Sequence, residues 1–451
     1  MIWRPLAILL LAVSAAFGRR RLELLQRATD IRADGEDKLL LVQTVWRHGD
    51  RSPIYTFKND KVKESQWTKG GGGYGQLSPH GMEQHLRLGQ ELRKRYKDFI
   101  DARYRSNEIY VRSTDVNRTI ISAISNLAGF YTAGVPDEDY PKNLQGWPGA
   151  FVPVPIHTVD HNDDYVTGCS YESKRGVEVF GKLRRAPDYM NVPLTDKLNV
   201  VTGDESSSTL WNVYNVFDTL FIEKIYKFNW PDGMTDELYK ETQDLADLID
   251  DIELGMNISD AEGVHFETEV PKTAGGPLLA ALIGHMQAKR TCFEKKPEDR
   301  TAEEAKLCSF YDPLKYYVYS AHDSTLGALF STFGFKYTDV NATGLPHYAA
   351  CVALELYSRS NGASNEYTVK LIFWQDGIDA WDITQDIAGC ERNCTLDKFA
   401  GGGGGSTGMQ SDFPSGWRCM LFCNNVPSAA SSTPAGLAAL LVSLLVHVFL
   451  K

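Results

Sequence analysis

The chain has 451 residues, enough for one large domain with an insertion or for two domains. Hydrophobic residues make up 43% and charged residues 23%, a balance that excludes a disordered chain. The net charge of −11 argues against nucleic acid or an anionic membrane surface as a partner, although a local group of arginines can still attract a small anion.

The N-terminus predicts a secretory signal peptide over residues 1–18. A positively charged start precedes a short apolar stretch, and the small residues of Ser14–Gly18 offer a cleavage site. A buried N-terminal helix is the alternative. Asn-x-Ser/Thr glycosylation signals agree with secretion and stand at Asn117, Asn257, Asn341 and Asn393. We expect the last three to be used, because Asn117 lies close to a functional segment.

Eight cysteines in a secreted chain are expected to form disulfides. Cys390 and Cys394 can close a small loop, and Cys292 and Cys308 can close a larger one. The sequence alone does not fix the pairing.

An apolar run over residues 38–45 predicts a buried central strand, which ends before Pro53. Arg47, His48 and Arg51 therefore follow its carboxyl end, where open α/β sheets bind ligands. Guanidinium forks suit phosphate, and His48 is either a further ligand or a nucleophile. A basic surface loop is the alternative.

Residues 67–75 are glycine-rich and predict a flexible loop, after which Ser78 caps a helix that runs to about residue 100. A second strand is predicted over 108–112 and a helix from 116 to about 131. Arg112 would then stand at a strand end just ahead of a helix N-terminus, where an anion is favoured. The alternative is a surface arginine.

Residues 134–271 predict a mostly helical insertion packed over one end of the sheet. The insertion contains His157 and His161 with acidic residues nearby. This group could pass for a metal site, but its proline-rich setting does not secure the spacing, so we prefer a polar loop.

A third strand is predicted over 316–320, and His322 and Asp323 follow it directly. Three strand ends therefore deliver polar side chains, which predicts a single site. A helix precedes this strand, over 277–288, and another follows it, over 326–333. Residues 347–357 and 366–374 predict two further strands, in a hairpin at the sheet edge.

The C-terminal residues 426–451 combine small residues, a spacer and an apolar tail. Their fourteen apolar residues, 437–450, are short for a membrane span, and the pattern is typical of a GPI-anchor signal. A short membrane anchor and an unused signal are the alternatives.

Taken together, three motifs resemble those of the histidine acid phosphatase family, most closely its prostatic and lysosomal branch. They are Arg47–Pro53, Arg112–Asp115 and Ala321–Asp323, with further support from Gly75–Ser78, Gly81–Met82, Pro155–Val159 and His347–Cys351. The likeness runs from about residue 39 to residue 419.

The resemblance implies an α/β fold, phosphoglycerate-mutase-like, with a mixed central sheet flanked by helices and an inserted, mostly helical cap domain. Residues 19–133 and 272–425 would form the α/β domain, and residues 134–271 the cap. Members of the family often form homodimers, so a homodimer is expected here.

The resemblance also implies a secretory-pathway acid phosphatase that hydrolyses phosphate monoesters without a metal or other cofactor. His48 would become phosphohistidine, and Asp323 would protonate the leaving alcohol. The phosphoryl oxygens would be bound by Arg47, Arg51, Arg112 and His322. The alternatives are a phytase, a lysophosphatidate phosphatase or an inactive surface protein on the same fold.

Physical chemistry agrees with these roles. Phosphoryl transfer needs charge neutralisation, which fixed arginines can supply. The same arginines disfavour a protonated imidazole at His48. A bound dianion should raise the pKa of Asp323, so activity should be highest at acid pH.

The resemblance favours the disulfides Cys169–Cys419 and Cys390–Cys394. In the related branch, the counterpart of Cys351 pairs with a cap cysteine, but the matching stretch here, 220–222, has none. Cys351 would then be free, or would pair with Cys292, Cys308 or Cys423. A tyrosine-based cytosolic tail is also missing, so we expect the extracellular face of the plasma membrane, with lysosomal or secreted protein as the alternatives.

Overall fold

The computed structural model describes residues 37–401 except 162, 168–173, 191–195, 204–209, 335–345, 362–363, 378, 388–389 and 391–392. Within these residues, a seven-stranded sheet has the order β3-β2-β4-β1-β5-β6-β7. The strands are β1 (Asp37–Arg47), β2 (Ile109–Thr114), β3 (His157–Val159), β4 (Tyr316–Ala321), β5 (Cys351–Asn361), β6 (Ser364–Trp374) and β7 (Ala380–Asp382). The first four strands are mutually parallel, and the last three pair antiparallel with their neighbours. This confirms the predicted mixed sheet.

Strand β1 lies inside the sheet because both of its faces are apolar. Leu41 and Val45 belong to the hydrophobic cluster on one face, and Val42 and Trp46 belong to the cluster on the other. Side chains alternate between the two faces of a strand, so a run of apolar residues is buried on both sides.

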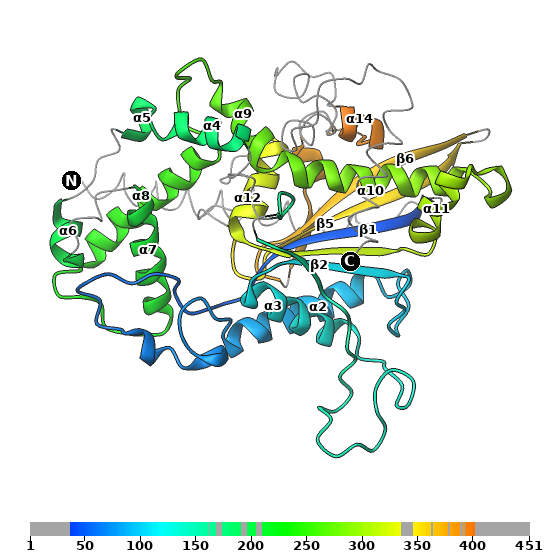
Figure 1. Cartoon of the computed structure of the whole chain (residues 1–451), viewed down its shortest axis with the longest axis horizontal. Helices are drawn as coiled ribbons and strands as arrows, with labels where there is room; N and C mark the ends of the chain where they lie inside the picture. The colour runs from blue at the N-terminus through cyan, green and yellow to red at the C-terminus, as the bar shows by residue number, and fades with distance from the viewer. Residues whose placement is uncertain are drawn as a thin grey trace, which may run out of the picture.

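Helices cover both faces of the sheet (Figure 1). One face carries α2 (Pro79–Arg95) and α3 (Asn117–Phe130), and the other carries α10 (Gly276–Glu294), α11 (Ala302–Tyr311) and α12 (Asp323–Thr332). The Ser78 side chain accepts a hydrogen bond from the backbone N–H of Gly81, which confirms the predicted N-cap.

A group of helices lies beside one end of the sheet, at the left of Figure 1. Its members are α4 (Lys174–Leu183), α5 (Pro187–Met190), α6 (Asp196–Thr202), α7 (Leu210–Ile225), α8 (Asp236–Glu253) and α9 (Phe266–Ala274). These helices share a hydrophobic cluster that Phe57 and Ala328 join from the rest of the fold. We call this group the cap. Its predicted boundaries, 134 and 271, remain a prediction.

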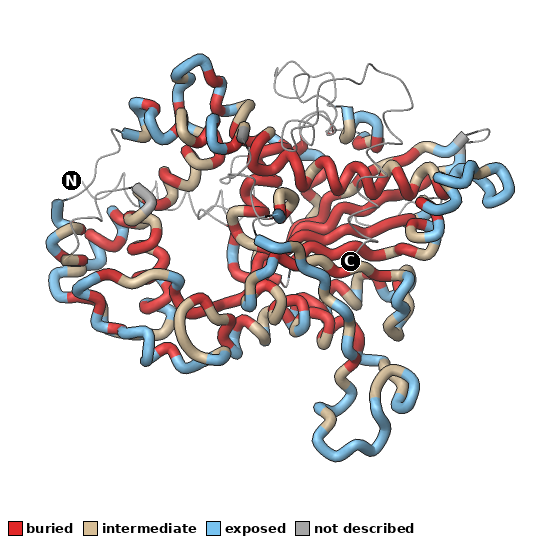
Figure 2. The backbone as a smooth tube through the Cα atoms, viewed as in Figure 1, coloured by how far each residue is buried: buried red, intermediate tan, exposed pale blue. Residues whose placement is uncertain are grey.

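The remaining elements are short: η1 (Glu64–Gln66), η2 (Lys69–Gly71), η4 (Pro297–Asp299), η5 (Thr384–Asp386) and α14 (Leu396–Gly401). His157 lies in β3, where its ring stacks on Tyr110 with 4.6 Å between centroids, and His161 is exposed. Figure 2 shows the sheet as the most deeply buried part and the segment over 134–151 as a largely exposed extension.

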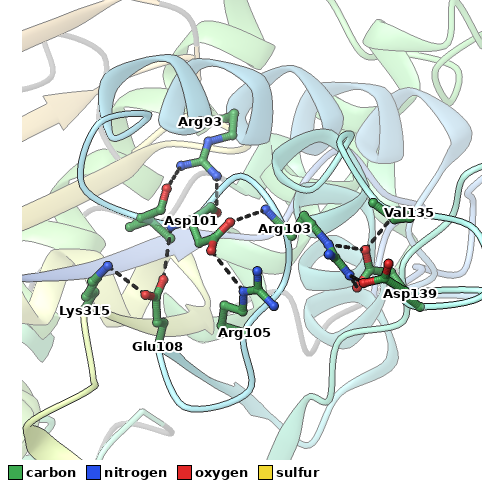
Figure 3. A network of polar contacts seen from close by, with 10 residues as sticks. Arg93, Asp101, Arg103, Arg105, Glu108, Val135, Asp139 and Lys315 are labelled. Atoms are coloured by element: carbon green, nitrogen blue, oxygen red, sulfur yellow. Dashed lines mark hydrogen bonds and ion pairs between the residues drawn. The ribbon is translucent and has the colours of Figure 1, made fainter.

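A polar network ties the amino ends of β2 and β4 to the end of α2 (Figure 3). The Lys315 ammonium pairs with Glu108 at 2.7 Å, and the Arg93 guanidinium donates to the carbonyl oxygens of Ile100 and Asp101, each at 2.7 Å. These contacts lie at the opposite end of the parallel strands from their carboxyl ends. We therefore assign the network to stabilising the fold.

One buried contact joins the cap to the loop after β1. Glu223 of α7 is fully buried, and Asp60 beside it accepts hydrogen bonds from Thr56 and the backbone N–H of Val62. Burial, together with the Asp60 side chain, raises the pKa of Glu223 to about 9. Glu223 is therefore a neutral carboxylic acid that can donate to the Asp60 carboxylate.

The described residues contain two disulfides, Cys292–Cys308 and Cys390–Cys394, both among the pairs considered from the sequence. Cys351 is buried and pairs with no cysteine of the described residues, and Cys292 and Cys308 are excluded as its partners because they pair with each other. The signal peptide, residues 426–451, Asn341, Cys169, Cys419 and Cys423 lie outside the described residues. No helix of the described part is both long and apolar enough to span a membrane.

Candidate active site

The carboxyl ends of β1 and β4 lie side by side. Arg47, the last residue of β1, is in parallel register with Ala321 of β4, and the backbone N–H of His48 donates to the Ala321 carbonyl with N and O 3.0 Å apart. His322 and Asp323 follow Ala321, and Asp323 is the first residue of α12. The structure thus brings Arg47, His48, His322 and Asp323 to one edge of the sheet.

Glycine at position 49 is required by the close approach of α2. An added Cβ would lie 2.4 Å from the carbonyl oxygen of Gly81, and one at Gly81 would lie 2.3 Å from that of Asp50. Both distances are shorter than real Cβ contacts, so side chains are excluded at both positions. The Asp50 carboxylate also accepts hydrogen bonds from Ser78 and Tyr226. The loop that carries His48 is thereby fixed against the start of α2.

The imidazole of His48 is held as a neutral base. Its Nδ1 lies 2.8 Å from the carbonyl oxygen of Gly49, and because a carbonyl only accepts, Nδ1 carries the proton and Nε2 keeps its lone pair. Burial lowers the pKa of His48 well below its usual value, and the charges of Arg118, Arg51 and Arg47 lower it further.

Asp323 is ion-paired with Arg47. The distance from Arg47 Nη2 to Asp323 Oδ2 is 2.8 Å, and the backbone N–H of Ser324 donates to Oδ1 at 2.7 Å. Burial alone would raise the pKa of Asp323, but the charges of Arg47 and Arg51 outweigh it and hold that pKa below its usual value. The rise that we predicted from the sequence would come only with a bound dianion, whose charge opposes that of the arginines.

His322 lies between β2 and α3. Its Nε2 is 3.0 Å from the hydroxyl of Thr114, and its Nδ1 is 3.5 Å from Nη2 of Arg118. A guanidinium only donates, so Nδ1 accepts and Nε2 carries the proton. Burial and the charge of Arg118 lower the pKa of His322, which keeps the ring neutral. The ring centroids of His322 and His48 are 5.7 Å apart.

Arg51 is bound to the cap. Its Nη1 and Nη2 donate to the two carboxylate oxygens of Asp218 on α7, at 3.0 and 3.1 Å. Both side chains are less than a tenth exposed, so this is a buried, two-pronged ion pair. The cap helix therefore fixes the orientation of an arginine that follows the central strand.

Three arginine Nε atoms in this region lack a partner. Those of Arg47, Arg51 and Arg118 are buried and bond to no described residue. Buried donors in folded proteins normally have an acceptor. The charges of all three arginines act on the imidazole of His48. Three guanidinium groups whose charges act on one imidazole suit an anion with several oxygens, such as a phosphoryl group.

The comparison with known families agrees with this chemistry. The sequence profile of the histidine phosphatase superfamily (branch 2) matches residues 38–374, which is most of the chain. The chain belongs to the histidine phosphatase superfamily. It is therefore an enzyme of the phosphatase class, as the sequence predicts.

Relatives in the superfamily share much of the sequence. The chain is 35% identical to the lysosomal acid phosphatase of Xenopus laevis over 372 residues, which covers 80% of this chain and 75% of the relative. It is 30% identical to the prostatic acid phosphatase of Homo sapiens over 376 residues, which covers 80% and 84%. The Hafnia alvei phytase in complex with myo-inositol hexakis sulphate shares the fold, with a TM-score of 0.52, 13% identity, and coverage of 81% of this chain and 96% of that one.

Arg112, which we predicted for the site, is bound elsewhere. Its Nη2 donates to Asp164 at 2.6 Å, and the Asp164 side chain is only 2% exposed. Asp164 also accepts the backbone N–H groups of Val166 and Thr167, so the pair organises the loop after β3. The third arginine beside His48 and His322 in this superfamily member is Arg118.

Arg118 lies at the site in place of the predicted Arg112 because of where strand β2 ends. Strand β2 runs to Thr114, two residues beyond the predicted end, so Arg112 lies within the strand and not at its end. Arg118 occupies the first turn of α3, which begins at Asn117. A cation at a helix N-terminus opposes the helix dipole, and this unfavourable position is the signal in the sequence that we missed.

Arg118 and Arg112 should respond differently to replacement by methionine. Arg118→Met should weaken competitive inhibition by inorganic phosphate at least about tenfold, because it removes charge-assisted donors. Arg112→Met should leave that inhibition near wild type and lower the free energy of unfolding by about 3 kcal/mol, because a buried carboxylate loses its partner. Inhibition assays and urea unfolding of both variants measure this, and a larger loss of phosphate affinity in Arg112→Met would reverse the assignment.

Proposed function

We propose that the chain hydrolyses phosphate monoesters at acid pH through a phosphohistidine formed on His48. The observation that carries the proposal is the neutral Nε2 of His48 among the positive charges of Arg47, Arg51 and Arg118. A nucleophile with a lone pair next to fixed cations is suited to attack a phosphoryl group, whose negative oxygens the cations attract.

The first step forms a bond between His48 Nε2 and phosphorus and breaks the bond between phosphorus and the ester oxygen. Arg47, Arg51 and Arg118 bind the non-bridging oxygens and neutralise their charge, a task that metal ions perform in many other phosphoryl-transfer enzymes. His322 accepts a hydrogen bond from Arg118 and so orients that guanidinium. Asp323 gives a proton to the departing oxygen. Water then attacks phosphorus and gives a proton to the Asp323 carboxylate, the N–P bond breaks with its electron pair returning to His48 Nε2, and inorganic phosphate leaves.

The proton that Asp323 donates must arrive with the substrate. Arg47 and Arg51 hold the pKa of Asp323 below its usual value before substrate binds, so the carboxylate is then ionised. The second pKa of a phosphoryl group is about 6, and below that pH the ester carries a proton into the site. This supports an acid pH range for the reaction.

The cap residues near the site favour simple monoesters as substrates over polyphosphates such as inositol phosphates. Asp218 occupies two donors of Arg51. These donors are then not available to the further phosphates of a polyanionic substrate.

The test is hydrolysis of p-nitrophenyl phosphate by the purified protein across a pH series, with and without a chelator. We expect a rate that rises as the pH falls below 7 and that the chelator does not change. A rate that is highest above pH 7, or one restored only by a divalent ion, would contradict the proposal.

The route to the cell surface belongs to the same proposal. The two disulfides of the described residues and the exposed side chains of Asn257 and Asn393 support an oxidising compartment with glycosylation. Secretion through the signal peptide, a GPI anchor, a Cys169–Cys419 disulfide and a homodimer follow from the sequence and its resemblance alone. Lysosomal or secreted protein remains the alternative, as the names of the relatives suggest.

A further inference from the structure

The segment from Pro346 to Ala350 packs directly on Arg47 and His48. The Pro346 carbonyl accepts from Arg47 Nη1 at 2.6 Å, and the Ala349 N–H donates to the His48 carbonyl at 3.1 Å. Ala349 has a φ of 59°, a left-handed conformation that costs a non-glycine residue about 1 kcal/mol. Backbone strain of this kind persists where the surroundings enforce it, often at functional sites.

Tyr348 is the side chain that this strained segment presents to the site. The guanidinium carbon of Arg47 lies 4.3 Å from the centroid of the tyrosine ring, a cation–π contact. The ring centroid is 6.0 Å from that of His48 and 6.4 Å from that of Phe221 on the cap helix α7. Tyr348 therefore lies between the nucleophile and the cap.

The phenol of Tyr348 has no partner among the described residues. The residue is 9% exposed, and its hydroxyl oxygen is buried without a hydrogen bond. Buried tyrosine hydroxyls usually find one. Arg51 and Arg47 are the cations that act most strongly on this hydroxyl, so it lies in the field of two arginines of the site.

We propose that Tyr348 binds substrate: its O–H donates a hydrogen bond to a non-bridging oxygen of the phosphoryl group, while its ring supports Arg47. This inference rests on the proposed function and adds a neutral donor to the arginine cluster. Burial raises the pKa of Tyr348 above its usual value, so the hydroxyl stays protonated throughout the working pH range. The role also gives a function to one residue of the His347–Cys351 motif, for which sequence analysis gave none.

Tyr348→Phe tests the hydroxyl alone, because it keeps the ring that supports Arg47. We expect the dissociation constant of inorganic phosphate, measured by calorimetry at acid pH, to rise about tenfold, as for loss of a hydrogen bond to a charged group. The KM for p-nitrophenyl phosphate should rise with it. Thermal unfolding should be unchanged, since no described residue loses a hydrogen bond.

Tyr131→Phe is the matched control. The Tyr131 hydroxyl is also buried without a partner, but its ring packs against Tyr104 and Phe130. This variant should bind phosphate as the wild type does. Tyr348→Leu removes ring and hydroxyl together and should weaken binding further than Tyr348→Phe.

The outcomes separate this inference from the proposed function. If the wild type neither binds phosphate nor hydrolyses the ester, the proposed function fails. If the wild type does both and Tyr348→Phe binds phosphate with an unchanged dissociation constant, the hydrogen bond does not exist. A loss confined to Tyr348→Leu would leave only the support of Arg47 by the ring and would equally overturn the inference.

Discussion

His48→Ala should lower kcat for phosphate esters by more than about 10³-fold, the scale of loss seen when a covalent nucleophile is removed. Nε2 of His48 is the lone pair that the geometry offers to phosphorus, since Nδ1 donates to the Gly49 carbonyl. The arginines remain in the variant, so its affinity for inorganic phosphate should stay within a fewfold of wild type. Steady-state kinetics and phosphate titration measure the two effects separately.

Two further measurements make this result specific to the nucleophile. Imidazole added to the His48→Ala assay should restore part of the rate, because it supplies the missing nitrogen to the space that the side chain filled. Enzyme quenched in alkali during turnover of a labelled ester should carry phosphate on the wild type and none on the variant. An undiminished rate in His48→Ala would mean that another group attacks phosphorus.

Asp323→Asn should affect esters according to their leaving groups. Hydrolysis of an alkyl phosphate should fall about 10²- to 10⁴-fold, the usual contribution of a general acid, because an alkoxide is a poor leaving group. p-Nitrophenyl phosphate should lose far less, since p-nitrophenolate leaves without a proton. The ratio of the two kcat/KM values, wild type against variant, is the measurement.

Asp218→Asn provides the control, because Asp218 is also a buried carboxylate paired with an arginine of the site. Its loss disturbs the orientation of Arg51, so both esters should slow by the same factor. In the wild type, hydrolysis of the alkyl ester should decline as the pH rises through about 6, where the substrate loses the proton that Asp323 needs. Equal losses for both esters in Asp323→Asn would remove Asp323 from the role of acid.

The sequence was sufficient to predict the centre of the site because the centre depends on two strand ends. The apolar runs before Arg47 and His322 are long enough to identify two buried strands, and parallel strands end at the same edge. Arg112 was misplaced because residues Ser113 and Thr114 continue β2, a boundary that pattern alone places only to within a few residues. The sequence therefore predicted that strand β2 exists, but it did not predict where Arg112 lies along that strand.

Asp218 and Tyr348 could not be predicted for a different reason. Asp218 meets Arg51 across 167 residues of chain through the docking of α7. Tyr348 lies beside Arg47 because residues 346–350 pack on the end of β1. Both placements are tertiary, and no local pattern of hydrophobicity or turn residues encodes them.

The neutral Glu223 at the contact between the cap and the loop after β1 makes the stability of the fold depend on pH. The folded chain keeps this proton up to about pH 9, whereas an unfolded glutamic acid loses it near 4.5, so unfolding between these values releases a proton. Raising the pH across that window therefore lowers the free energy of unfolding by about 1.4 kcal/mol per pH unit from this residue. Acidification therefore raises the contribution of this residue to the free energy of unfolding, in the same pH range in which the substrate is protonated.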